Sequence, residues 1–199
     1  MKLLISISAA AILLTTTALA QTEAPAKYVH RTLTVEPSVG IHTDMDVDLL
    51  LSALVQWNPR RKLAFASHSS YNINNITSRD VESVHTDYNY SLTQRLGVGT
   101  TLYGKRSSHS LFLMGGVSYT AYQETLVNPS LEQVSVSISS LSPDYGVMYS
   151  LKKGGKKWFF TFRAYLPLYP WPMKGADINY VDANIYAISL EFGVGIRIK

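Results

Sequence analysis

Apolar and polar residues alternate with a period of two along most of the chain after residue 27. The pattern is clearest from Tyr186 to Ile198, where every even position is apolar and every odd position is small or polar. Because successive side chains of a strand point to opposite faces, this segment is predicted to be a strand with one apolar face. Helical periodicity is hard to find in the same part of the chain. We therefore predict an all-β protein.

The alternation divides the chain into nine segments. They cover residues 29–41, 45–57, 63–73, 84–92, 98–102, 111–121, 134–151, 158–168 and 186–198. Between them lie turn signals such as "NPRR", "TQRLG", "GKRSSH" and "KKGGKK". The segment 134–151 changes phase at Ser139–Ser140, which favours a β-bulge there, with a turn at "SLSPD" as the alternative. Pro37 makes the first segment doubtful as a full strand, because proline cannot donate a ladder hydrogen bond.

The strand count follows from closure. A barrel that returns both ends of the chain to one side needs an even number of strands. We expect eight, with ten as the alternative. The fold predicted is a closed antiparallel up-and-down transmembrane β-barrel, formed by a single domain over residues 21–199.

Residues 1–20 have the features of a secretory signal peptide. Lys2 precedes an apolar run that ends at Leu14, and Ala18-Leu19-Ala20 resembles a small-x-small cleavage site before Gln21. The apolar run is too short to span a membrane as a helix. We expect cleavage near Ala20/Gln21, and a mature chain without a transmembrane helix.

Composition excludes several classes of function. The chain has no cysteine, so neither a disulfide framework nor a thiolate metal site can form. The formal net charge is +4, and seven of the 18 basic residues lie in the turn signals "RRK" and "KKGGKK". No recognition helix or aromatic platform accompanies this charge, so we expect no nucleic-acid partner. We also expect no cofactor and no metal.

The apolar faces could meet either a protein core or lipid. Three features favour lipid: opposite charges on the polar face, which a narrow interior tolerates only in pairs; aromatic residues near segment ends; and long strands. The aromatic residues are Trp57 beside "NPRR", Trp158 beside "KKGGKK", and Tyr88 and Tyr90 near "TQRLG".

The face assignment of the last strand gives specific expectations. The residues expected to contact lipid are Tyr186, Ile188, Leu190, Phe192, Val194 and Ile196. Ser189, Glu191 and Arg197 are expected to point into the lumen. There, neighbouring strands allow two ion pairs, Arg163–Glu191 and Arg197–Glu36.

The signal peptide, the alternating spans and the final stretch "EFGVGIRI" resemble the small bacterial outer-membrane β-barrel family of the OmpX/OmpA transmembrane-domain type. The chain departs from that pattern by ending on Lys199 instead of an aromatic residue. The resemblance implies location in a Gram-negative cell outer membrane, insertion by the barrel-assembly machinery, and contact with outer-membrane lipid or lipopolysaccharide. We expect a monomer. The resemblance implies no activity, because one fold serves many functions.

A search for catalytic chemistry gives one faint signal. "ASHSSYN" places His68 two residues before Ser70, a spacing similar to the His-x-Ser pair of lipid A deacylases. Both residues lie on the polar face, whereas an enzyme that cuts a membrane lipid needs its nucleophile facing the bilayer. We therefore expect no catalytic residues and a non-enzymatic barrel with a structural or surface-interaction role. The alternatives are a lipid-modifying enzyme or narrow, porin-like pore, and a soluble secreted barrel that binds an apolar ligand.

Overall fold

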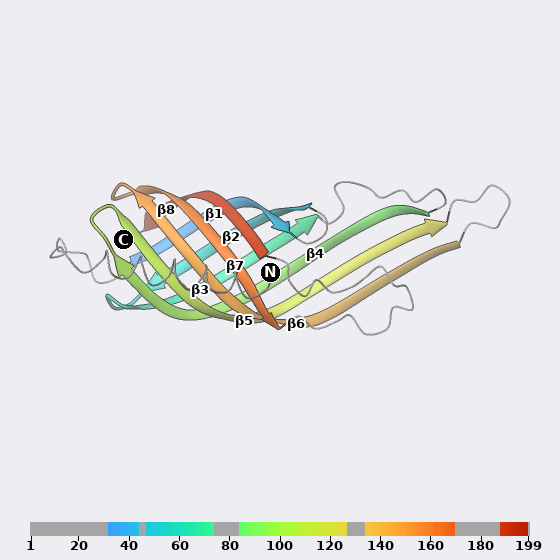
Figure 1. The fold of residues 1–199 in the computed structure, drawn as a ribbon, viewed down its shortest axis with the longest axis horizontal. Helices are drawn as coiled ribbons and strands as arrows, with labels where there is room; N and C mark the ends of the chain where they lie inside the picture. The colour runs from blue at the N-terminus through green and yellow to red at the C-terminus, as the bar shows by residue number, and fades with distance from the viewer. Residues whose placement is uncertain (1–31, 44–46, 74–83, 127–133, 170–187, 199) are drawn as a thin grey trace, which may run out of the picture.

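The computed structural model describes residues 32–43, 47–73, 84–126, 134–169 and 188–198. They form a closed barrel in which each strand pairs with the next along the chain and β8 pairs with β1 (Figure 1). The strands are β1 (Thr32–Thr43), β2 (Val47–Asn58), β3 (Leu63–Ile73), β4 (Val84–Tyr103), β5 (Ser107–Leu126), β6 (Val134–Gly154), β7 (Trp158–Tyr169) and β8 (Ile188–Ile198). The prediction of an eight-stranded antiparallel barrel is confirmed. The signal peptide and Tyr186 lie outside the described residues.

β1 is a full strand despite Pro37. Pro37 lies opposite Ala53 in the pairing with β2, which runs without a break from Thr32 to Thr43. On the other side, the pairing with β8 passes from Val35 directly to Ser38. The proline, which has no N–H to donate, therefore sits where the closing ladder is interrupted. The doubt about this strand was wrong.

The turn expected at "TQRLG" does not exist. Residues 84–103 form one strand, and Arg95 lies in its middle, opposite Gly116 of β5. Gln94, on the outer face, makes hydrogen bonds to Ser67 and Ser69 of β3, which ties this stretch into the sheet. The polar residues that suggested a turn belong to a strand, with Gln94 on its outer face and Arg95 on its inner face. Joining 84–92 to 98–102 reduces nine segments to eight strands.

The prediction of a bulge at Ser139–Ser140 is also wrong, and so is the alternative prediction of a turn. The pairing of β6 with β5 keeps one register from Ser107 opposite Lys153 to Leu126 opposite Val134. The register shift in β6 lies elsewhere, between Tyr145 and Gly146 in the pairing with β7.

The phase change in β6 has a different cause. Pairing of β6 with β7 starts at Tyr145, and pairing of β4 with β3 starts at Tyr90. Within the described strands, residues 84–89 of β4 and 134–144 of β6 therefore pair with β5 alone. We call these residues and their β5 partners the extension; Figure 1 shows the three strands continuing beyond the others. Asp144, at the boundary of the extension, still reaches the lumen through its ion pair with Arg95. Farther from the closed ring, β6 has β5 as its described neighbour, so its apolar phase is free to change.

The two ends of the barrel differ in their connections. Residues 59–62, 104–106 and 155–157 form short turns at one end, where β1 begins and β8 ends. We call this the turn end. The segments 44–46, 74–83, 127–133 and 170–187 join the strands at the opposite end, the loop end. In the described part of the chain, no helix has the length and apolarity needed to cross a membrane.

Candidate functional site: a charged lumen inside an apolar surface

The inner face of the barrel is polar. The alternation of each strand directs one set of side chains inward, and this set contains ionisable groups with almost no exposure. Buried polar residues on this face include Thr34, Glu36, Gln56, His68, Arg95, Lys152, Arg163 and Glu191. A smaller apolar cluster shares the interior, including Leu54, Phe112, Met114, Met148 and Tyr165.

Arg163 and Glu191 lie directly opposite one another on β7 and β8. Nη2 of Arg163 is 2.8 Å from Oε2 of Glu191, and each side chain is at most 1% exposed. The hydroxyls of Ser38 and Ser52 donate to the same carboxylate at 3.1 and 2.5 Å. The structure thus brings together the first of the two pairs expected from the sequence.

His68 connects this pair to a second one. Its Nε2 is 3.1 Å from Oε1 of Glu191, and its Nδ1 is 3.3 Å from Nη1 of Arg95. Since a guanidinium can only donate, Nδ1 must accept, and Nε2 carries the hydrogen that is donated to Glu191. Arg95 in turn pairs with Asp144, with 2.6 Å between Nη2 and Oδ2. The hydroxyl of Tyr165 donates to the other oxygen of Asp144.

The second expected pair, Arg197–Glu36, is wrong. Glu36 forms its ion pair with Nζ of Lys152, and Thr161 donates to its other oxygen at 3.0 Å. Arg197 is instead near the turn end, where Nη1 donates to the carbonyl of Lys156 at 3.2 Å and the guanidinium lies over Phe159. The strands are neighbours as expected, but Lys152 reaches Glu36 from across the lumen.

The lumenal network is close to neutral. It contains three basic side chains, Lys152, Arg163 and Arg95, and three carboxylates, Glu36, Glu191 and Asp144. Buried charges are tolerated only when they are paired and hydrogen-bonded, and each of these has an ionic partner. A group of three or more side chains that could hold a metal ion does not occur within the described residues.

The His-x-Ser motif belongs to this network. His68 is completely buried on the inner face, with one ring nitrogen committed to Glu191 and the other to Arg95. An imidazole held in this way has no nitrogen left to take a proton from Ser70. Both residues also face the lumen, as the alternation predicted.

Three members of the network escaped sequence reasoning. Arg95 was assigned to the turn signal "TQRLG" and Lys152 to "KKGGKK", and Asp144 lies in "SLSPD", which was only the alternative turn. The signal that could have found them is the phase of the alternation, which shows whether a residue lies on the inner or the outer face. Lys152 shares the even phase of Met148 and Ser150, both of which are buried, so it belongs to the inner set.

The outer face is apolar over most of the barrel. On β8, Phe192 is 60% and Val194 43% exposed, and Ile188, Leu190 and Ile196 are half-buried. These five residues lie on the face expected from the sequence, opposite the buried Ser189 and Glu191. Leu96, Leu113 and Phe160, on other strands, are 65%, 61% and 73% exposed.

Aromatic side chains on the outer face gather toward both ends of the strands. At the turn end, Trp57 and Phe65 stack with ring centroids 5.7 Å apart, and Trp158 and Phe160 are exposed. Tyr90 is near the loop end, because β4 continues through "TQRLG", and its ring contacts those of Tyr71 and Tyr88. The expected position of the two tyrosines beside a turn was therefore wrong.

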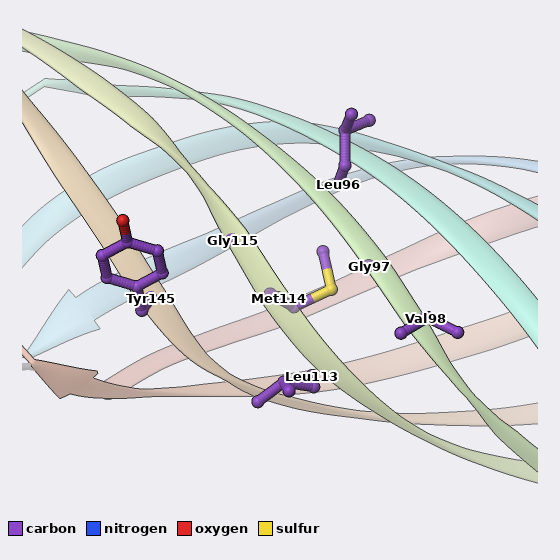
Figure 2. A pocket seen from close by; sticks show the side chains of 7 residues that line it. All are labelled: Leu96, Gly97, Val98, Leu113, Met114, Gly115 and Tyr145. Carbon is purple, nitrogen blue, oxygen red and sulfur yellow. The ribbon is translucent and has the colours of Figure 1, made fainter.

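A groove of about 410 Å³ marks the outer surface over β4, β5 and β6. Figure 2 shows Leu96 and Val98 on β4, Leu113 on β5 and Tyr145 on β6 around Gly97 and Gly115. Gly115 faces outward without a side chain, which leaves the hollow between larger neighbours. Its lining is almost entirely apolar. The groove thus continues the character of the outer face.

These features define a small up-and-down barrel with the usual polarity of a protein reversed. At the level of fold, the resemblance to small outer-membrane barrels is confirmed, because eight antiparallel strands close in sequence order. No family model matches the chain. No curated protein matches it either.

Comparison with solved structures finds small barrels of low identity. The N-terminal β-barrel domain of Pseudomonas aeruginosa OprF is 9% identical with a TM-score of 0.44, covering 83% of this chain and 97% of that one. Neisserial surface protein A is 11% identical with a TM-score of 0.47, covering 84% and 97%. Ail, the attachment invasion locus protein of Yersinia pestis, is 7% identical with a TM-score of 0.47, covering 85% and 98%; its structure contains the heparin analogue sucrose octasulfate.

Proposed function

We propose that the chain is a non-enzymatic integral barrel of a Gram-negative outer membrane, with a structural or surface-interaction role. The observation that carries this proposal is the contrast between the two faces of one sheet, with buried charges inside and exposed apolar side chains outside. Glu36, Arg163 and Glu191 are at most 1% exposed inside, while Leu113 and Phe192 are about 60% exposed outside. A membrane barrel needs this arrangement, because acyl chains surround it and its polar groups must be satisfied within.

The alternative of a soluble barrel that binds an apolar ligand is less well supported. Such a barrel would enclose an apolar cavity and expose polar residues. Here the interior contains paired charges, and apolar side chains cover the outside of all eight strands. Exposed apolar surface on this scale is typical of a membrane or protein interface.

The pore alternative is also less well supported. Eight strands give an interior that side chains just fill. The network from Lys152 to Asp144 crosses that interior from β6 through β1, β7, β8, β3 and β4 and back to β6, and most of its side chains are nearly inaccessible to solvent. A lumen that is filled by paired side chains in this way favours a structural barrel over a pore.

The extension supports a surface-interaction role. Short turns face the periplasm and longer connections the exterior in barrels of this class, so the loop end and the extension would project outward. Among the described strands, residues 136–144 of β6 have β5 as their pairing partner, and the other side of this stretch is a sheet edge within the described part of the chain. Sheet edges can accept an additional strand from a partner.

The proposal includes lipid and lipopolysaccharide as the surroundings, insertion by the barrel-assembly machinery, and a monomer. Its test is fractionation combined with electrophoresis before and after boiling. We expect the mature chain in the outer-membrane fraction, with a band that shifts on heating because the folded barrel resists detergent. Recovery of folded protein in the periplasmic fraction without detergent would overturn the proposal. Stepwise conductance in a planar bilayer would favour the pore instead.

A further inference from the structure

The charge carried by the three short turns of the turn end is of one sign. The three short turns and the strand ends beside them carry eight basic residues, all exposed: Arg60, Arg61, Lys62, Lys105, Arg106, Lys153, Lys156 and Lys157. No acidic residue occurs within 58–63, 103–108 or 152–158. We call these eight side chains the basic ring.

The loop end has the opposite composition. The four segments that join the strands there contain seven acidic residues, Asp44, Asp46, Asp80, Glu82, Glu132, Asp177 and Asp182, and two basic ones, Arg79 and Lys174. The net charge of the chain is only +4, so the basic ring reflects segregation of charge to one end. A general need for solubility would not separate the signs in this way.

The basic ring lies directly beyond the aromatic residues of the turn end. Trp57 is three residues from Arg60, and Trp158 follows Lys157. Both indoles are on the outer face, 49% and 56% exposed. In membrane proteins such aromatic side chains lie at the level of the headgroups. The next residues outward are therefore at the depth of lipid phosphates.

The turns that carry the basic ring are held by backbone hydrogen bonds. Gly155 N–H donates to the Trp158 carbonyl at 2.9 Å, and Arg197 N–H donates to the Lys157 carbonyl at 2.9 Å. Gly104 N–H donates to the Ser107 carbonyl at 2.8 Å. The long basic side chains are thus anchored on ordered backbone while their charged ends stay exposed.

We propose that the basic ring binds the headgroups of anionic phospholipids in the membrane leaflet at the turn end. This inference rests on the proposed function, because it requires the barrel to span a bilayer. Lysine and arginine bind phosphate by charge-assisted hydrogen bonds, and each basic residue near an anionic surface changes association by up to about fivefold. The lipid selected by this end of the barrel would be a phosphoglyceride with net negative charge.

The test uses the full mature chain reconstituted in phosphatidylcholine bilayers. Spin-labelled phosphatidylglycerol or phosphatidylcholine is added in trace amounts. The fraction of the labelled lipid that is immobilised at the protein surface gives its relative association constant. We expect the anionic label to be preferred at about 0.1 M salt. The preference should weaken at about 1 M salt, where the screening length falls from about 10 to about 3 Å.

The decisive variant is K156Q/K157Q, which removes two exposed charges and leaves the backbone hydrogen bonds intact. Its matched control is R79Q/K174Q, which changes the net charge equally at the loop end. We expect a severalfold loss of preference in the first variant and no change in the second. Equal loss in both variants, or no preference in the unmodified chain, would overturn the inference. A chain that fails to insert, seen as a band that does not shift on heating, would instead overturn the proposed function.

Discussion

The strands β4, β5 and β6 belong both to the closed body of the barrel and to the extension, yet they obey different rules in the two regions. In the body, each residue of β5 faces either the lumen or the outside, and inward Phe112 is buried while outward Leu113 is 61% exposed. In the extension, Val136 and Leu141 of β6, which lie on opposite faces of one strand, are 38% and 68% exposed. The comparison shows that closure of the ring, and not the strand itself, gives a face its polarity.

The largest expected effect comes from breaking the lumenal network in the body. Arg163→Met leaves Glu191 buried without its main cationic partner, and should lower the free energy of unfolding by about 3–5 kcal/mol. Urea unfolding of the protein in lipid vesicles measures the loss. The control is a double-mutant cycle with Glu191→Gln. Strictly additive losses would contradict the interaction that the 2.8 Å contact implies.

The second prediction compares the same substitution in the two regions. Leu113→Arg in the body should cost about 2–4 kcal/mol, because in the proposed membrane barrel it places a charge among acyl chains. Leu141→Arg in the extension should cost close to nothing, although Leu141 is exposed to a similar degree. The same vesicle unfolding experiment applies. Similar losses at both positions would mean that the two regions meet the same medium.

The third prediction compares the two faces of β5 at adjacent glycines. A Cβ at Gly116 would collide with the backbone carbonyl oxygen of Gln94, whereas one at Gly115 would meet the Tyr145 ring at 3.5 Å. Gly116→Ala should therefore cost about 1–3 kcal/mol by overpacking. Gly115→Ala should be nearly neutral. A greater loss at Gly115 would contradict the assignment of the open and crowded faces.

The smallest expected effect is in the extension. Ser137→Pro should change the unfolding of the barrel by less than about 1 kcal/mol, because Ser137 is opposite Gln123 of β5 and outside the closed ring. Val147→Pro, in the part of β6 that pairs with both neighbours, is the control and should prevent formation of the heat-shifted band. A barrel that fails to form in the Ser137 variant would show that the extension is needed for folding.

The sequence predicted the fold class and the facing of the strands well, because a polar inner face and an apolar outer face impose a period of two on each strand. It located β2, β3, β7 and β8 within a few residues. The prediction failed where a polar residue could have either of two structural roles. Arg95 in "TQRLG" could serve a turn or a lumen, and local sequence does not distinguish them.

The partners of the lumenal charges were harder to predict than their facing. Arg163–Glu191 follows from adjacency of β7 and β8, which the chain order determines. Lys152–Glu36 joins β6 to β1, which are not neighbours, across the interior. Such a pair depends on the diameter of the barrel and the length of the lysine side chain. Neither is visible in an alternating pattern.

The pairing of β8 with β1 has a consequence for how the chain folds. The Ser38 hydroxyl donates to Glu191, which is 153 positions farther along the chain, and the ladder that joins their strands is the one interrupted at Pro37. Contacts this distant along the chain carry a high entropic cost of loop closure and slow the reaction that forms them. The ring can close only after its last strand has been synthesised. Until then, β1 retains an open edge that must be shielded from other chains.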